Sequence, residues 1–193
     1  MPIFVDSPLS GNVTEVFVSH PECFDAQTNQ EFIKNRKNPF GFGKLQYTHT
    51  VEESKALNEV QGPCIIISAS GMCENGRILH HLRNNIDDPR NTLLLVGYMA
   101  KDTLGRKILE KQQVVNIFGE PHNLRAEVVV MDAFSGHADR SDLLDYISKV
   151  EGLKRIFLVH GEEEQSGFFA QILHESGYKD VTRNEPGIVY EIP

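Results

Sequence analysis

The sequence predicts an α/β protein with a mostly parallel β-sheet and helices on both of its faces. Short apolar runs alternate with segments whose apolar residues recur at helical spacing, the pattern of strand–helix–strand units. The 193 residues are 40% hydrophobic and 24% charged, which is ordinary for a globular protein with a stable core.

Apolar runs mark the expected strands. The first, Pro2–Val5, begins almost at residue one with no helix before it. We therefore expect the chain to be the later part of a longer protein. The other expected strands are Leu45–Thr48, Cys64–Ser68, Thr92–Val96, Val114–Phe118, Ala126–Met131, Arg155–Val159 and Ile188–Ile192.

Capping and stop signals mark the expected helices. Thr50 with Glu53 forms a capping-box pattern, Asp139 is a typical N-cap, and Gly177 is a typical helix stop. The expected helices begin after Ser10, run from Thr50 to near Gly62-Pro63, from Gly76 to Asn85 and from Thr103 to Lys111, follow Asp139, and span Ser166–Ser176.

Two segments read as loops. Asn35–Gly43 is basic, aromatic and rich in Pro and Gly; it is either a mobile surface loop or a loop that faces a substrate. Phe118–Asn123 reads as a break. We place a domain boundary there, between residues 1–122 and a small strand–helix–strand–helix unit at residues 123–193.

Bulk properties narrow the class of protein. A net charge of −8 argues against a protein held to nucleic acid mainly by a basic surface. The three cysteines form no CxxC pair, which favours reduced thiols over a disulfide framework. Because no signal peptide or membrane span is apparent, we expect a soluble, cytoplasmic protein with no membrane partner.

The segment Ser68-Ala69-Ser70-Gly71-Met72 follows three isoleucines. Small residues let backbone N–H groups approach a ligand, and the next helix adds a positive dipole end, so the segment is a candidate phosphate site. The motif alone is weak, and an ordinary strand-to-helix turn is the simpler interpretation.

Two histidines follow apolar runs directly. His137 lies in Ser135-Gly136-His137-Ala138-Asp139, and His160 ends a Leu-Val-His run. Imidazoles at the carboxyl ends of parallel strands can act as acid, base or metal ligand. We expect the two strands to be neighbours, and their histidines to lie close together. A lone histidine in a turn is more often a plain surface residue, and zinc needs three or four ligands.

Taken together, the ordered motifs resemble the C-terminal half of the β-CASP branch of the metallo-β-lactamase superfamily. This family includes ribonuclease J and the RNA nucleases related to cleavage and polyadenylation factors. The matching segments are Val5–Leu9, Ser68–Met72 with Gly76-Arg77, Val96–Tyr98 with Thr103–Gly105, Phe134–Asp139 and Leu158–Glu162.

The resemblance implies specific roles. His137 matches a histidine that lies by the scissile phosphate and assists cleavage as an acid. His160 matches a ligand of one of two zinc ions. The turns that hold RNA phosphates correspond here to Ser135, Gly136 and Ala138, and to Ser68, Ser70, Gly71 and Met72.

The departure from the family pattern is equally informative. The HxHxDH signature, which supplies most zinc ligands, is absent from this sequence. We therefore expect part of a zinc-dependent RNA-processing nuclease that is inactive alone, with RNA and the missing N-terminal half or a second copy as partners. The alternative is a non-catalytic module that binds RNA or a protein partner. The DNA-repair branch fits less well, because it carries valine where this chain has His160.

Overall fold

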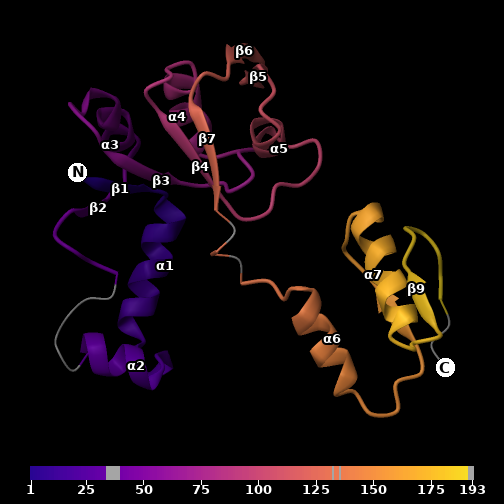
Figure 1. The fold of residues 1–193 in the computed structure, drawn as a ribbon. Helices are drawn as coiled ribbons and strands as arrows, with labels where there is room; N and C mark the ends of the chain where they lie inside the picture. The colour runs from indigo at the N-terminus through magenta and orange to yellow at the C-terminus, as the bar shows by residue number, and fades with distance from the viewer. Residues whose placement is uncertain (34–39, 132, 135, 191–193) are drawn as a thin grey trace. The chain divides into compact units, whose positions relative to one another are not determined.

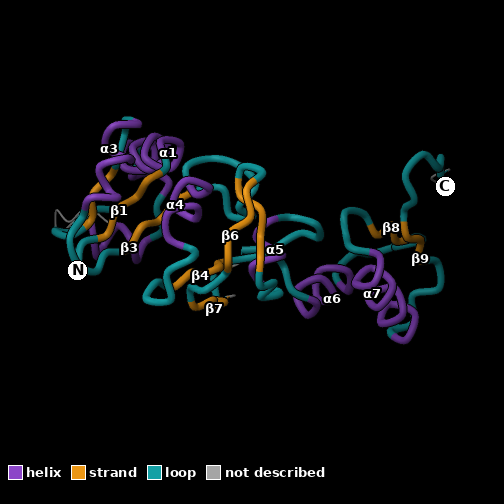
Figure 2. The backbone as a smooth tube through the Cα atoms, turned by 90° about the horizontal axis from the view of Figure 1, so that it is seen from above, coloured by secondary structure: helices purple, strands orange, loops and turns teal. Residues whose placement is uncertain are grey.

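The computed structural model describes residues 1–33, 40–131, 133–134 and 136–190. It divides the chain into two compact units, Met1–Ser135 and Gly136–Pro193. Strands and helices alternate in both units (Figures 1 and 2), and the paired strands are mostly parallel. The predicted α/β class is confirmed.

A three-stranded parallel sheet opens the first unit. Strand β1 (Ile3–Asp6) lies in the centre, between β2 (Leu45–Tyr47) and β3 (Ile65–Ser68). Helices α1 (Pro8–Ser19) and α3 (Val51–Ala56) lie in the connections between these strands. Because the strands are parallel, their carboxyl ends share one edge of the sheet.

Four short helical turns lie between these elements: η1 (Pro21–Cys23), α2 (Ala26–Thr28), η2 (Asn29–Ile33) and η3 (Leu57–Glu59). The first three were not predicted from the sequence. The candidate loop Asn35–Gly43 lies outside the described residues for its first five positions.

A second group of elements completes the first unit. Strand β4 (Thr92–Val96) pairs in parallel with β7 (Glu127–Met131). In place of the single expected sheet, the described strands therefore form several small ones. The helices of this group are α4 (Ile78–Asn85) and α5 (Leu104–Leu109).

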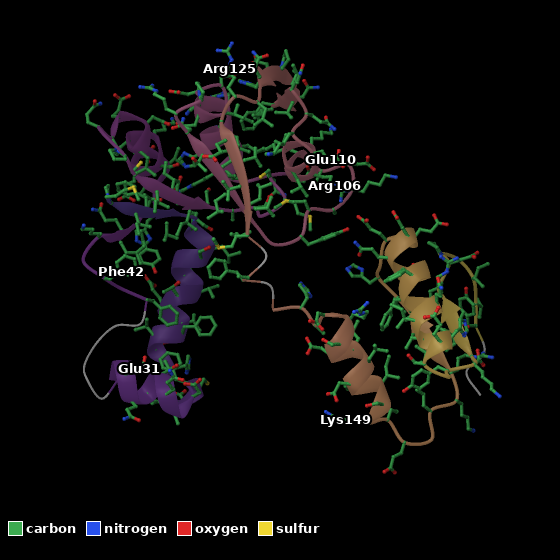
Figure 3. All side chains as sticks on the ribbon, in the orientation of Figure 1. Glu31, Phe42, Arg106, Glu110, Arg125 and Lys149 are labelled. Atoms are coloured by element: carbon green, nitrogen blue, oxygen red, sulfur yellow. The ribbon has the colours of Figure 1, made fainter. Side chains whose placement is uncertain are left out.

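The core of this group is a single apolar cluster. Leu82 of α4, Leu95 of β4 and Ile108 of α5 are all buried in it. Charged side chains such as Arg106 and Glu110 lie on the solvent side of α5, where they form an ion pair (Figure 3).

The expected break at Phe118–Asn123 is instead part of an antiparallel hairpin. Strand β5 (Val114–Ile117) pairs with β6 (Glu120–Asn123) across a two-residue turn at Phe118 and Gly119. Both turn residues have positive φ, as a tight hairpin turn of this kind requires. The segment looked like a break because its Gly and Pro suit loops as well as hairpins, and Pro is tolerated in an edge strand.

The second unit contains α6 (Arg140–Ser148), β8 (Ile156–Leu158), α7 (Glu163–Glu175) and β9 (Val181–Arg183). Strands β8 and β9 pair in parallel. The sequence missed β9, because three residues with polar neighbours give too short a pattern. The strand expected at Ile188–Ile192 is wrong for residues 188–190, which are not in a strand, and its last two residues lie outside the described part of the chain.

Side-chain caps explain where α1, α3 and α6 begin. The predicted capping box of Thr50 and Glu53 is present, and Asp139 caps α6 as predicted. Helix α1 begins earlier than expected, at Pro8, because the Ser7 side chain accepts a hydrogen bond from the Ser10 N–H. The Asp139 cap places the start of α6 directly after the candidate site residues Gly136, His137 and Ala138.

One face of the β4–β7 pair is apolar and exposed. Leu94 lies opposite Val129, and Val96 lies opposite Met131. All four side chains are at least 36% exposed. Parallel sheets are normally covered on both faces, so this face lacks the usual cover among the described residues.

Candidate phosphate-binding turn and metal ligands

The turn that follows β3, residues 68–76, is closed by hydrogen bonds within itself. The Ser70 N–H donates to the Asn75 carbonyl at 3.1 Å, and Ser70 Oγ accepts from the Asn75 N–H at 3.4 Å. Gly76 has φ +84°, and a Cβ there would lie 2.6 Å from the Ala69 carbonyl oxygen. The turn therefore requires glycine at this position.

The outer side of the turn offers hydrogen-bond donors. Gly71 is exposed, and a Cβ at this position would meet only open space. The N–H groups of Gly71 and Met72 have no acceptor among the described residues. Adjacent backbone N–H groups in a turn can bind an anion.

The helix that follows the turn was expected to add a positive dipole end. Its first two N–H groups form hydrogen bonds within the protein. The Ile78 N–H donates to the Ala69 carbonyl, and the Leu79 N–H donates to the Gly76 carbonyl. These two N–H groups are therefore hydrogen-bonded to the turn and are not available to a phosphate.

A buried carboxylate lies beside the turn. Asp6, the last residue of β1, is fully buried. Its Oδ1 accepts hydrogen bonds from Thr48 and, at 2.5 Å, from Arg77 Nη1. Its Oδ2 accepts from Ser54 Oγ and His81 Nε2, both at 2.6 Å. We call Asp6, Thr48, Ser54, Arg77 and His81 the Asp6 cluster.

The Asp6 cluster is strongly polarised. Burial alone would raise the pKa of Asp6, but hydrogen bonds from Ser54, Thr48, His81 and Arg77 outweigh it and lower the pKa to about 2. Asp6 is therefore ionised at neutral pH. Because His81 Nε2 donates to a carboxylate, its Nδ1 is left buried with no partner in the described part of the chain.

Sequence reasoning missed this cluster. Asp6 was assigned to the family pattern at Val5–Leu9, and Arg77 was noted only as part of a motif. The available signal was a charged residue at the end of an apolar strand. If such a residue is buried, it almost always has partners, so its position indicates a polar cluster. The partners themselves lie 42 to 75 residues away in the sequence and could not be identified from it.

The segment around His137 is exposed. Gly136, His137 and Ala138 lie on the surface of the second unit, directly before the capped start of α6. Ser135 lies outside the described residues. The Ser141 hydroxyl and the Asp142 N–H donate to the Asp139 carboxylate, which lowers the pKa of Asp139.

His160 lies two residues beyond the end of β8 and is also exposed. Its φ of +64° is unusual for a residue other than glycine. The expectation that the two histidines follow neighbouring strands stays a prediction. Strand β7 belongs to the first unit and pairs with β4, and strand β8 belongs to the second unit and pairs with β9.

These residues do not make a zinc site by themselves. Zinc in proteins is bound by three or four nitrogen, sulfur or oxygen ligands. Throughout the described ranges, no group of three or more His, Cys, Asp or Glu side chains is arranged to hold a metal ion. His160 can contribute one ligand at most, and no chemical step through a metal follows from this chain.

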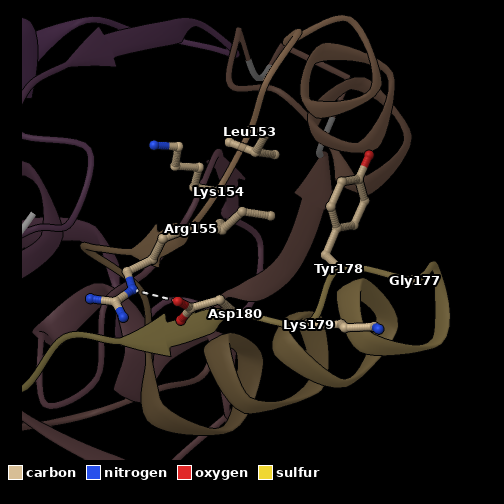
Figure 4. A pocket seen from close by; sticks show the side chains of 8 residues that line it. Leu153, Lys154, Arg155, Gly177, Tyr178, Lys179 and Asp180 are labelled. Carbon is tan, nitrogen blue, oxygen red and sulfur yellow. Dashed lines mark hydrogen bonds and ion pairs between the residues drawn. The ribbon is translucent and has the colours of Figure 1, made fainter. Parts of the chain in front are cut away.

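A basic pocket lies at the edge of the β8–β9 sheet that is opposite to the edge near His160 (Figure 4). It has a volume of about 260 Å³ and is lined by residues 153–156 and 177–180. Lys154 and Lys179 contribute positive charge, while Arg155 Nε pairs with Asp180 at 2.7 Å. Because the pocket precedes both strands, it lies at the sheet edge away from His160.

No helix in the described part of the chain is long and apolar enough to cross a membrane.

Comparison with known proteins identifies two domains in this chain and a related ribonuclease. Residues 1–108 match the Beta-Casp domain model, and residues 121–182 match the model of the Zn-dependent metallo-hydrolase RNA specificity domain. The Ribonuclease TTHA0252 of Thermus thermophilus is 42% identical over 164 residues, which cover 85% of this chain and 37% of the relative.

Two archaeal relatives give a similar picture. An RNase J-like protein of Methanocaldococcus jannaschii is 35% identical over 90% of this chain and 38% of its own length. The transcription termination factor FttA of Pyrococcus abyssi is 31% identical over 90% of this chain and 28% of its own length. The chain thus spans about a third of the length of these relatives. With a Beta-Casp model matching more than half of its residues and an RNA specificity domain following, this chain belongs to the Beta-Casp family of metallo-β-lactamase-type proteins.

Proposed function

We propose that this chain is the RNA-binding part of a zinc-dependent RNA-processing nuclease, with the turn Ser68–Met72 as a site for an RNA phosphate. The observation that carries the proposal is the pair of N–H groups at the exposed residues Gly71 and Met72, which find no acceptor in the described part of the chain and lie at the carboxyl edge of a parallel sheet. In open α/β sheets ligands collect at this edge. The similarity to a ribonuclease and the match to an RNA specificity domain support RNA as the ligand.

The two histidines have different proposed roles. We assign His137 to the scissile phosphate, where its imidazole can protonate the leaving oxygen, with Ser135, Gly136 and Ala138 as further phosphate contacts. We assign His160 as one ligand of a zinc ion whose other ligands come from outside these 193 residues. Both imidazoles are exposed, so a substrate or a metal can reach them.

This chain alone is expected to bind RNA without cutting it. One imidazole cannot hold zinc tightly, and the HxHxDH signature is absent from the sequence. A longer protein, in which a segment with that signature precedes this chain, is expected to bind zinc and cleave.

The experiment compares metal content, by elemental analysis, with single-turnover cleavage of a labelled RNA. In the longer protein His160→Ala should lower zinc content and abolish cleavage. His137→Ala should slow cleavage by a factor of about 10² to 10⁴, the usual contribution of a general acid, with zinc content unchanged. His174→Ala is the control, because this exposed histidine of α7 forms a local hydrogen bond with the Tyr178 carbonyl, four residues along the chain.

Two results would contradict these assignments. Chelator-sensitive cleavage by the 193 residues alone would show that the chain carries a complete metal site. Loss of zinc in the His137→Ala protein would show that the roles of the two histidines are reversed.

A second candidate function is a non-catalytic module that binds RNA or a protein partner. It is favoured by the absence of any three-ligand metal group among the described residues. This second function would be supported if the longer protein binds RNA as tightly as the 193 residues alone do, but does not cleave the RNA even when zinc is supplied.

We further propose a protein partner for the apolar face of the β4–β7 pair. Leu94, Val96, Val129 and Met131 expose a contiguous apolar surface that association would cover. The remainder of a longer nuclease fits this role, since the relatives are about three times as long as the matched region. Sedimentation of the chain alone tests the alternative, a second copy, which would appear as a dimer that Leu94→Glu dissociates.

A further inference from the structure

We propose that Asp6 is the positioning residue of the phosphate-binding turn, because both ends of the turn are tied to this one buried residue. The inference rests on the RNA-binding function proposed above and adds to it a residue that does not touch RNA. It concerns the first unit alone and involves neither histidine of the second unit.

The first end of the turn is tied to the backbone of Asp6. Ser68 lies directly opposite Asp6 in the β1–β3 register. The Ser68 hydroxyl also donates to the Asp6 carbonyl oxygen, at 2.9 Å. The residue at which the turn begins is therefore fixed on β1 by its strand pairing and by its side chain.

The C-terminal end of the turn is held by the carboxylate of Asp6. Arg77 follows the turn directly, and its Nη1 lies 2.5 Å from Asp6 Oδ1. The same guanidinium donates through Nη2 to the His49 carbonyl, at 3.1 Å. One turn of helix later, His81 Nε2 lies 2.6 Å from Asp6 Oδ2. A planar guanidinium that bridges two acceptors fixes orientation as well as distance.

The charge of Asp6 does not act on a bound phosphate directly. The side chain is fully buried, and four donors occupy its two oxygens. Its negative charge is compensated by Arg77, whose side chain is only 17% exposed. The contribution of Asp6 to anion binding is therefore geometric.

That geometry matters because the turn binds through backbone groups. The N–H groups of Gly71 and Met72 can converge on one phosphate only while the ends of the turn stay fixed. If Arg77 is released, part of the binding energy must order the turn. This cost of ordering the turn should weaken RNA binding roughly three- to tenfold.

The test measures binding of a fluorescein-labelled single-stranded RNA to the 193-residue chain, with a chelator present and well below the melting temperature of every variant. Arg77→Gln and Arg77→Lys release the turn, and lysine keeps the positive charge without bridging two acceptors. Asp6→Asn removes the negative charge that holds Arg77, while Arg77 keeps its own positive charge. Ser54→Ala is the matched control, because Ser54 also donates to the Asp6 carboxylate but belongs to α3 rather than to the turn.

A positioning role predicts weaker RNA binding, roughly three- to tenfold, for both Arg77 variants and for Asp6→Asn, with Ser54→Ala unchanged. A purely structural role predicts that all four variants lower the melting temperature, while the folded fraction binds RNA as before. Direct contact of Arg77 with a phosphate predicts that Arg77→Lys and Asp6→Asn retain affinity, while Arg77→Gln alone loses about 0.7 from the slope of log K against log salt.

Either of the last two results overturns the inference. Should Asp6→Asn fail to fold, the comparison of Arg77→Lys with Ser54→Ala decides between the same outcomes. No measurable RNA binding by the wild-type chain would contradict the proposed RNA-binding function itself. Wild-type binding with unaffected Arg77 variants would contradict only the role of Asp6.

Discussion

Replacing Asp6 with asparagine should destabilise the first unit more than any comparable change of a surface carboxylate. Asparagine keeps the shape of the side chain but removes its charge, and its amide nitrogen faces two donors where the carboxylate had an acceptor. Arg77 is then left nearly buried without its anionic partner. Breaking a buried pair in this way costs about 3–5 kcal/mol.

The pKa of Asp6 provides a second, independent magnitude. Folding lowers this pKa from its ordinary value of 3.8 to about 2. At about 1.4 kcal/mol per pKa unit, the ionised form is stabilised by about 2 kcal/mol relative to the protonated form. Because the pKa in the folded state is lowered, this stability is fully present above about pH 4 and is lost as the pH falls towards 2.

The assay is urea denaturation followed by far-UV circular dichroism, since the chain has no tryptophan. Asp88→Asn is the control: the pKa of Asp88 is also lowered to about 2, but by Arg90, whose side chain is 87% exposed. We expect a clearly smaller loss for this control, because water screens the exposed pair. The difference between wild type and Asp6→Asn should shrink from pH 5 to pH 2. Equal losses for the two variants at pH 7, or a pH-independent difference, would refute the reasoning.

Three further predictions concern single residues of the first unit. Cys73 is buried, and burial raises the pKa of its thiol to about 11, so at pH 8 it should resist thiol reagents until urea unfolds the chain. The exposed Cys23 should react at once. Rapid labelling of Cys73 in the native protein would contradict this expectation. Gly76→Ala should lower the unfolding free energy by about 1–3 kcal/mol, because it combines positive φ with a clash at the Ala69 carbonyl; an unchanged urea midpoint would show that the turn adapts. Ile108→Ala should cost about 2–5 kcal/mol, since the side chain is fully buried in the core cluster, and a loss below 1 kcal/mol would mean that the core collapses around the gap.

Features that depend on neighbouring residues could be predicted from the sequence. The strand Thr92–Val96 has the predicted bounds, because a run of five apolar or β-branched residues between polar neighbours is typical of a short buried strand and is too short for a buried helix. The capping box at Thr50 and the N-cap at Asp139 were predictable for the same reason, since a helix start is encoded within four residues. The family was recognisable because its motifs are ordered along the chain.

Features that depend on distant residues were decided only by the tertiary structure. The pairing of β4 with β7 joins segments about 35 residues apart, and β9 is a strand only because β8 offers it backbone partners. The Asp6 cluster is the clearest case. Nothing near Asp6 in the sequence identifies the partners of its carboxylate. The buried carboxylate is stable because folding brings Thr48, Ser54, and Arg77 together with His81, from three other segments, to neutralise and hydrogen-bond it.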